Sequence, residues 1–260
     1  AATGDRQLSD EELAAITERA AGNPLFLQHL ASPEEAVDET EELPETVEAL
    51  VATRIDRLAP GDRALLRWAS VLGTSFSVLV IRDVLEEDPT AAADSEAWDR
   101  LAEFVERDPE VPNAFRFRHA LIRDAAYEGL SYRRRRELHG KVAEVLERRE
   151  PDAVELLSLH FHRAEDKPAT WRYSLEAGRD AQAKWANLEA AEFYERALDA
   201  ASEVPGLEVS AIAATWESLG DCLHLAGRFD RGAEAYERAL ELTPKSSPQH
   251  IEVLFKQGAL

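Results

Sequence analysis

The sequence contains no methionine, one cysteine and no long apolar run. Because position 1 is not methionine, we expect the chain to be a piece of a longer protein. The single Cys222 excludes an internal disulfide framework and a cysteine-based zinc site, and it favours a reducing cytoplasm. No stretch approaches the roughly 20 apolar residues of a transmembrane helix, and the N-terminus lacks the pattern of a secretory signal. We therefore expect a cytoplasmic protein with no membrane partner.

Motifs for hydrolysing nucleotides or binding metals are also missing. The sequence has no GxxxxGK[ST] loop to hold the β- and γ-phosphates of a nucleotide, and no Walker B strand that ends in an acid. His160 and His162 lie two positions apart, which places them on different faces of a helix and argues against a metal site. We assign this chain alone no catalytic residue, no metal and no cofactor, and we expect that it is not an enzyme by itself.

Positive charge is scarce and unevenly placed. The chain carries 30 Lys and Arg against 51 Asp and Glu, a formal net charge of -21, which opposes non-specific binding to nucleic acid. The segment from Phe115 to Arg149, however, contains ten Lys or Arg and five Asp or Glu. Its net charge is therefore +5, and that of the remaining residues is -26. Its most basic part is the run Arg133 to Arg136. The candidate roles of this segment are DNA binding, binding of nucleotide phosphates, or neutralisation of the protein's own acidic surface.

Composition and periodicity predict a mainly α-helical protein. Hydrophobic content is 45% and charged content 31%, values that fit a soluble globular chain. Apolar residues recur at helical spacing in successive segments that Gly and Pro separate. The predicted helices before residue 110 are LSDEELAAITERAA, LFLQHL, LPETVEALVATRIDRL, RALLRWASVLG with Gly73 as its C-cap, SVLVIRDVLEE and AWDRLAEFVE.

The period changes near residue 104. ERDPEVPNAFRFRH contains a turn with two prolines and an asparagine, and it predicts strands at Phe104 to Arg107 and at Ala114 to Arg118. Three helices followed by a strand hairpin are the order of a winged helix, which we place at about residues 61–118. From His119 onward the pattern is helical throughout.

The C-terminal region contains an internal repeat. Ala190, Tyr194 and Ala197 match Gly232, Tyr236 and Ala239 with a shift of 42 residues. In the second copy the 34-residue spacing of the tetratricopeptide repeat is complete, with small residues where two helices cross and bulky residues between them. Its positions are Trp216, Leu219, Gly220, Leu223, Gly232, Tyr236, Ala239 and Pro244. The first copy matches in its second helix only, EVPGLEVS forms an extra loop, and HIEVLFKQGAL begins a further repeat.

Three segments together resemble a known family. Arg19-Ala-Ala-Gly-Asn-Pro-Leu-Phe-Leu, LPETVEALVATRIDRL and FRFRHALIRDAAYEGL are similar, over residues 8 to about 150, to the regulatory ATPases of the STAND class. This class is related to AAA proteins, and it includes cyclase-linked proteins and large LuxR-type activators of bacteria. The resemblance implies that the whole protein binds ATP or ADP, and that an N-terminal NTPase core precedes residue 1.

The resemblance also indicates candidate nucleotide-binding residues. In this class a Gly-x-Pro turn lies beside the nucleotide, which would place Pro24 against the adenine, with Gly22 and Asn23 forming the turn. A histidine of the related plant immune receptors contacts the β-phosphate of ADP, and His119 occupies its position, although Arg118-His119-Ala120 departs from the Met-His-Asp motif on both sides. Alternatively, Gly22 to Pro24 is only a helix break and His119 is a capping or packed residue.

The arginine run has an internal explanation as well. Four consecutive positions spread Arg133 to Arg136 over about 300° of a helix, so they do not form one DNA-binding face. We expect them to pair with acidic neighbours such as Glu137 and with facing helices. DNA binding through this chain is disfavoured further because SEAWDRLAEFVERD, the third helix of the predicted winged helix, is acidic.

The predicted architecture is therefore mainly α, with four parts. We expect the end of a helical lid and a linker at residues 1–43, a winged-helix domain with a short β-hairpin at 44–118, a helical connector at 119–151, and a tetratricopeptide-like α-solenoid at 152–260. The expected function is regulation: the repeats sense a protein or peptide, and the nucleotide state controls an output domain such as a nucleotidyl cyclase. The alternatives are a winged-helix DNA-binding regulator with a repeat sensor, and a repeat scaffold with no nucleotide role.

Overall fold

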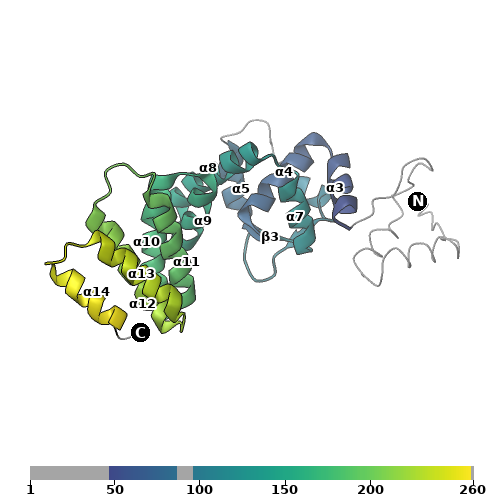
Figure 1. Cartoon of the computed structure of the whole chain (residues 1–260). Helices are drawn as coiled ribbons and strands as arrows, with labels where there is room; N and C mark the ends of the chain where they lie inside the picture. The colour runs from purple at the N-terminus through teal and green to yellow at the C-terminus, as the bar shows by residue number, and fades with distance from the viewer. Residues whose placement is uncertain (1–46, 87–95, 259–260) are drawn as a thin grey trace, which may run out of the picture.

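The computed structural model describes residues 47–86 and 96–258. The chain forms an N-terminal part, in which helices surround a small sheet, and a C-terminal part made of antiparallel helices packed side by side (Figure 1). The predicted lid and linker, at residues 1–43, precede the first of these ranges and therefore lie outside the described residues.

The N-terminal part alternates helices with short strands. Gly73 ends α4 with a φ of 124°, as the sequence predicts. The helix starts at Pro60, where a fixed φ is favourable, three residues before the predicted start. The elements in chain order are α3 (Val47–Arg57), α4 (Pro60–Leu72), β1 (Ser75–Ser77), α5 (Val78–Glu86), α6 (Ala97–Arg100), β2 (Val105–Arg107) and β3 (Ala114–Phe117).

The three strands form one antiparallel sheet in the order β1-β3-β2. The predicted hairpin of β2 and β3 is confirmed, and Asn113 adopts a left-handed φ of 57° just before β3. Aromatic side chains on the sheet gather around Trp98, whose ring centroid lies 4.9 Å from Phe115 and 5.6 Å from Phe76. This aromatic cluster attaches α6 to the sheet.

Two details of this part differ from the sequence prediction. The hairpin has a third strand, β1, because Phe76 of the segment Ser75–Ser77 pairs with Phe115 and is 3% exposed. The helix predicted over AWDRLAEFVE is wrong beyond Arg100, since Leu101 to Phe104 form a turn that leads into β2. Leu101 and Phe104 are nevertheless buried, so their apolar pattern reflects the core rather than a helix.

The core of the N-terminal part continues without interruption into the following helices, α7 (Ala120–Glu128), α8 (Tyr132–Arg149) and α9 (Val154–Ala164). One cluster of buried apolar side chains runs from Val51 through Ile122 and Leu138 to Leu157, and it reaches Tyr173 of α10 (Lys167–Ala183). The rings of Phe161 and Tyr173 stack with centroids 5.3 Å apart.

The C-terminal part consists of helix pairs. The pair of α10 with α11 (Asn187–Ala201) is followed by the pair of α12 (Val209–Leu225) with α13 (Phe229–Leu242), and α14 (Pro248–Gly258) packs on α13 (Figure 1). The EVPGLEVS segment contains the connection between the two pairs, as predicted.

The two helix pairs share the same close crossing. A Cβ atom on Gly220 would lie 2.5 Å from Cε1 of Tyr236, and a Cβ atom on Gly178 would lie 2.8 Å from Cε1 of Tyr194. Gly178 and Tyr194 lie 42 positions before Gly220 and Tyr236, which is the same shift as that of the sequence repeat. The prediction that the first copy matches only in its second helix is therefore wrong, because Gly178 places the first helix in the repeat too.

Candidate functional site

His119 lies at the N-terminus of α7. It occupies the N-cap position with an extended backbone (φ -142°, ψ 141°), and its carbonyl oxygen accepts a hydrogen bond from the N–H of Ile122 at 3.0 Å. Its imidazole makes no capping hydrogen bond and the residue is exposed. Of the two structural alternatives, a packed histidine is thus wrong, whereas His119 does cap α7 through its backbone carbonyl and not through its side chain. An exposed imidazole beside the positive end of a helix dipole suits an anionic group.

The other sequence candidates are either outside the described residues or already paired. Gly22, Asn23 and Pro24 lie outside the described ranges, so the structure does not place them relative to His119. Arg118 donates from Nε to the carbonyl of Ala102 at 2.7 Å and pairs with Glu106 at 3.0 Å.

Arg123 points back into the protein. Its Nε donates to the carbonyl of Ser70 at 2.9 Å, and its guanidinium carbon lies 4.8 Å from the ring centroid of Tyr127. These contacts join α7 to α4. Arg123 therefore fixes the helix that carries His119.

The arginine run holds α8 against its neighbours. Arg133 and Arg134 both pair with Glu137, at 2.9 and 3.3 Å. Arg135 pairs with Glu128 at 2.5 Å and also donates to backbone carbonyls at the end of α7, while Arg136 pairs with Glu165 at 2.8 Å and donates to the carbonyl of Ala164. The prediction that these arginines pair with Glu137 and with facing helices is confirmed.

The run also contacts aromatic side chains. The guanidinium of Arg134 lies 5.4 Å from the ring centroid of Trp68 on α4, and that of Arg135 lies 4.6 Å from Tyr127 on α7. Together with the ion pairs, these contacts connect α8 to α4, α7 and the end of α9. Arg134, Arg135 and Arg136 thus join α8 to its neighbours, whereas Arg133 pairs within α8, with Glu137, and its side chain is 90% exposed.

A buried polar chain crosses the same joint. The hydroxyl of Tyr127 lies 3.0 Å from Nε2 of His139, and Nδ1 of His139 lies 2.9 Å from Nδ1 of His160. His139 and His160 are 4% and 1% exposed. Burial lowers the pKa of His139 to about 3, with a further contribution from His160, and burial lowers the pKa of His160 to about 4. Both rings are neutral at pH 7, so one Nδ1–H donates to the other Nδ1.

Sequence reasoning missed this chain. It compared His160 with His162, two positions away, whereas the partner His139 lies on α8, 21 positions earlier. Two histidines on the buried faces of neighbouring helices were the available signal. Among residues 47–86 and 96–258, no three His, Cys, Asp or Glu side chains come together as a metal-binding cluster.

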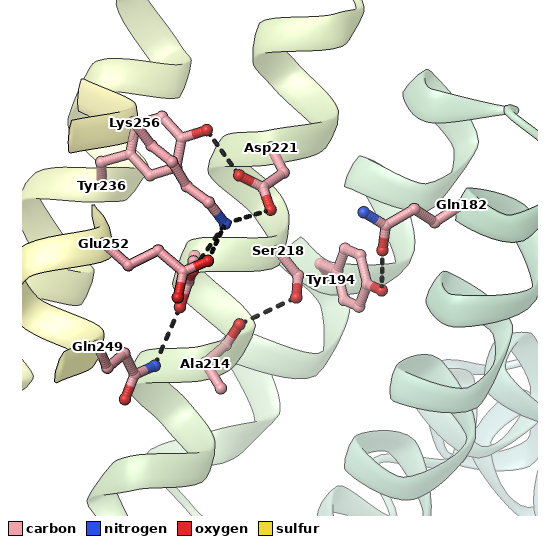
Figure 2. A network of polar contacts seen from close by, with 10 residues as sticks. Gln182, Tyr194, Ala214, Ser218, Asp221, Tyr236, Gln249, Glu252 and Lys256 are labelled. Carbon is pink, nitrogen blue, oxygen red and sulfur yellow. Dashed lines mark hydrogen bonds and ion pairs between the residues drawn. The ribbon is translucent and has the colours of Figure 1, made fainter. Parts of the chain in front are cut away.

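The helix pairs carry a second polar network (Figure 2). The ammonium of Lys256 on α14 lies 2.7 Å from Glu217 and 2.9 Å from Asp221, both on α12. The hydroxyl of Tyr236 donates to Asp221 at 2.7 Å, and the side-chain amide of Gln249 donates to Glu217 at 3.0 Å. Burial alone would lower the pKa of Lys256, but the bonds to Glu217 and Asp221 raise it above its ordinary value.

This network connects the helix crossing to the next helix. Tyr236 fills the space above Gly220, and its hydroxyl is held by the same Asp221 that binds α14 (Figure 2). In the first pair the hydroxyl of Tyr194 donates instead to Gln182, at 2.9 Å. The acidic residues that receive Lys256 are thus specific to the second pair.

Cys222 lies on the buried side of α12 and is 0% exposed. Burial raises the pKa of its thiol to about 11, with a smaller contribution from Asp221. A thiol that stays protonated at neutral pH and has no access to solvent is a packing residue.

Comparison with known proteins identifies the repeat. A family model for the tetratricopeptide repeat matches residues 186–245, which include α11, α12 and α13. The chain is 27% identical over 207 residues to an uncharacterized protein of Rhizobium meliloti (strain 1021), a match that covers 72% of this chain and 20% of the relative. The chain therefore spans about a fifth of the length of this curated relative.

One solved structure is similar over most of the chain. It is the crystal structure of a signal transduction ATPase with numerous domains (STAND) that has a tetratricopeptide repeat sensor, from Pyrococcus horikoshii. The sequence identity is 13%, the TM-score is 0.46, and the match covers 98% of this chain and 41% of the other.

No helix within the described ranges is long and apolar enough to cross a membrane.

Proposed function

We propose that this chain is the regulatory part of a STAND-class signalling ATPase, in which a tetratricopeptide array senses a protein or peptide partner. The proposal is supported by the repeat itself, which in general presents surfaces for protein partners. It is supported also by the sequence resemblance in the segments around Gly22 to Pro24 and around His119.

Within this proposal, residues 44–118 form a winged helix. The described order α4, β1, α5, α6, β2, β3 and the sheet order β1-β3-β2 support it. The arginine run lies outside this module, on α8, and its members pair with carboxylates of the protein itself. A DNA-binding role would require cations that face outward, whereas Arg134 and Arg135 are committed to Glu137 and Glu128.

The main structural support for the proposal is the hydrophobic core that continues from this module into the repeats. Buried side chains extend from Val51 to Tyr173, so α10 of the first helix pair shares one hydrophobic core with α7. Close-packed interiors transmit displacement rather than absorb it. A rearrangement of the repeats on binding a partner would therefore move α7, and with it His119.

His119 fits a role at a phosphate. Its imidazole is exposed at the N-terminus of a helix of nine residues, where backbone N–H groups and the helix dipole favour negative charge. In the whole protein His119 would hold the β-phosphate side of bound ADP, while Gly22, Asn23 and Pro24 would form the turn at the adenine. The nucleotide, when bound, supplies the phosphate charge that His119 would contact.

The whole protein would then have two arrangements. With ADP bound, His119 keeps α7 close to the NTPase core; exchange for ATP releases it, and the repeats shift the balance between the two arrangements. We place the protein in the cytoplasm, with hydrolysis carried out by the preceding NTPase core and an output domain such as a nucleotidyl cyclase or a DNA-binding activator.

The test uses the full-length protein that contains this chain. Pro24→Ala and His119→Ala are purified in parallel with wild type, and the ADP that co-purifies is quantified by chromatography after denaturation. We expect retained ADP to fall about tenfold in each variant. His119→Ala removes a hydrogen bond to a charged group, worth about 1.5 kcal/mol or more, and Pro24→Ala removes about two CH2 groups from the adenine contact, at about 0.8 kcal/mol each. His250→Ala on α14 serves as the matched control and should retain wild-type ADP. Unchanged retention in both site variants refutes the proposed sites.

The DNA-binding alternative is tested on the 260-residue chain. A gel-shift assay at low salt favours phosphate contacts of any kind. We expect no shifted band at micromolar protein, because the net charge of -21 repels the duplex. A tight complex would favour the winged-helix transcription regulator over the signalling ATPase.

A further inference from the structure

An apolar groove runs between α3 and α7, on the N-terminal part of the protein. It has a volume of about 470 Å³, and its apolar lining comes from both helices. Small side chains make the floor shallow: Ala49 and Ala52 on α3 and Ala125 on α7 lie beside the larger Ile55 and Leu121. Ile55 is buried, whereas Ala49 is exposed and the other three are half-buried.

The rim of the groove is acidic. Four carboxylates line it, Glu48 and Asp56 from α3 and Asp124 and Glu128 from α7, against one guanidinium, that of Arg67. The side chains of Asp56, Asp124 and Glu128 are 59%, 57% and 70% exposed. They are therefore open to a further cation from solvent.

The cations that already touch this rim leave it acidic. Arg67 pairs with Asp56 at 2.8 Å within the groove. Arg123 and Arg135 reach Asp124 and Glu128 from outside the lining, and each of them also donates to backbone carbonyls of the protein. Four carboxylates against the three guanidiniums of Arg67, Arg123 and Arg135 leave the rim with a formal charge of -1.

We infer that this groove docks an amphipathic helix of a partner protein, with leucine-like side chains on one face and lysine or arginine on its flanks. A floor of alanines with two carboxylates from each of the helices α3 and α7 is complementary to such a helix, whose apolar residues recur at i, i+3 or i+4, and i+7. The two helices that form the groove have 11 and nine residues, so the docked segment spans about 14–17 Å, or roughly three turns. The net charge of -21 would also accelerate association with a basic partner.

This inference does not depend on the proposed function. The groove involves neither His119 nor the helix repeats, and its occupant is defined by charge and shape alone. Unchanged ADP retention in the preceding experiment would refute the nucleotide site and leave the groove untouched, and a failure of the peptide to bind would leave the nucleotide site untouched.

The test measures binding of a synthetic peptide to the 260-residue chain. The probe is a fluorescein-labelled 14-residue helix with leucines at i, i+3, i+7 and i+10 and lysines on both flanks, followed by fluorescence anisotropy. Two comparison peptides are used: a scrambled peptide of the same composition, and the same helix with glutamate in place of lysine. We expect the probe to bind at least tenfold more tightly than either.

Variants of the chain locate the binding. Ala49→Gln and Ala52→Gln add bulk to the floor, and we expect each to weaken binding of the probe at least tenfold. Ala49 is exposed, so Ala49→Gln leaves the fold intact even where Ala52→Gln disturbs it. Asp124→Asn combined with Glu128→Gln should weaken binding and flatten its salt dependence. Ala183→Gln, at an exposed alanine of α10, is the matched control and should bind as wild type.

Four outcomes overturn the inference. The scrambled peptide binding as tightly as the probe would show attraction by net charge only, and wild-type affinity in Ala49→Gln would place the peptide elsewhere. Tighter binding of a synthetic peptide of residues 8–31 would assign the groove to this chain's own segment. A dimer in sedimentation that Ala49→Gln dissociates would assign it to a second copy, which also contradicts the inference.

Discussion

Replacing Gly220 by alanine tests the helix crossing that defines the repeat. The added Cβ would lie 2.5 Å from Cε1, 2.6 Å from Cδ1 and 3.0 Å from Cζ of Tyr236. The ring cannot swing away easily, because Tyr236 is 2% exposed and its hydroxyl donates to Asp221 at 2.7 Å. Either α12 and α13 separate or the hydrogen bond to Asp221 is lost.

The magnitude follows from two opposing effects. Overpacking a tight contact costs about 1–3 kcal/mol, and a separation of 2.5 Å is at the severe end. Alanine is better than glycine inside a helix by about 1 kcal/mol. We therefore expect Gly220→Ala to lower the free energy of unfolding by about 2 kcal/mol, which in a chain of this size lowers Tm by roughly 4–8 °C.

Two other glycines provide a graded series. Gly178→Ala faces Tyr194 at 2.8 Å or more, so we expect a smaller loss, of about 1 kcal/mol. At Gly140 of α8 the added Cβ would meet only Cβ of Ala164, at 3.7 Å, which is an ordinary contact. There the helix preference dominates, and Gly140→Ala should raise the free energy of unfolding by about 1 kcal/mol.

The assay is urea denaturation followed by tryptophan fluorescence and circular dichroism. Tyr236→Leu removes the ring from the helix crossing. In a protein that already carries Tyr236→Leu, Gly220→Ala should therefore lower the free energy of unfolding much less, which corresponds to a coupling energy of at least about 1 kcal/mol. The reasoning is refuted if Gly220→Ala is as stable as Gly140→Ala, or if the two changes at positions 220 and 236 are additive.

Further predictions concern buried titratable groups. Because folding lowers the pKa of His139 to about 3 and that of His160 to about 4, the unfolded chain binds protons below pH 6.5 that the folded chain does not. Stability should therefore fall as pH decreases from 7 to 5, by about 2 kcal/mol for each histidine; a His160→Gln variant with the same pH slope as wild type would contradict this. Cys222, whose pKa is raised to about 11, should react with a thiol reagent only in urea, and fast labelling of the native chain would show that α12 opens.

Local signals predicted most of the elements. Gly73 predicted the end of α4, although the helix starts at Pro60, three residues before the predicted RALLRWASVLG. Pro112-Asn113 predicted the turn between β2 and β3. The repeat spacing around Gly220 and Tyr236 predicted the helix pair, because a close crossing requires a small residue opposite a large one.

The sequence predictions were wrong where tertiary contacts determine the local secondary structure. Ser75–Ser77 has too few residues to show an alternating pattern, and it becomes a strand only because β3 is available as a partner. Leu101 and Phe104 continue the helical apolar spacing of AWDR, yet the chain turns there to enter the sheet.

The candidate site shows the same division. The position of His119 at the start of α7 was predicted from the strand and helix on either side of it, whereas its exposure was not. The pairing of His139 with His160 was not predicted, because it depends on how α8 and α9 pack against each other. The groove between α3 and α7 likewise combines residues about 70 positions apart, which no local pattern connects.

The central claim is that the N-terminal part and the repeats share one core, so that a change in the repeats reaches His119. Hydrogen exchange measured by mass spectrometry on Leu157→Ala tests it, because Leu157 of α9 is fully buried in that core and its truncation costs about 2–5 kcal/mol. Val253→Ala on α14, equally buried but in a separate cluster, is the control. We predict faster exchange in α7, α8 and α9 for Leu157→Ala, and in α13 and α14 only for Val253→Ala. Faster exchange confined to α9 and α10, with α7 unchanged, would contradict the account.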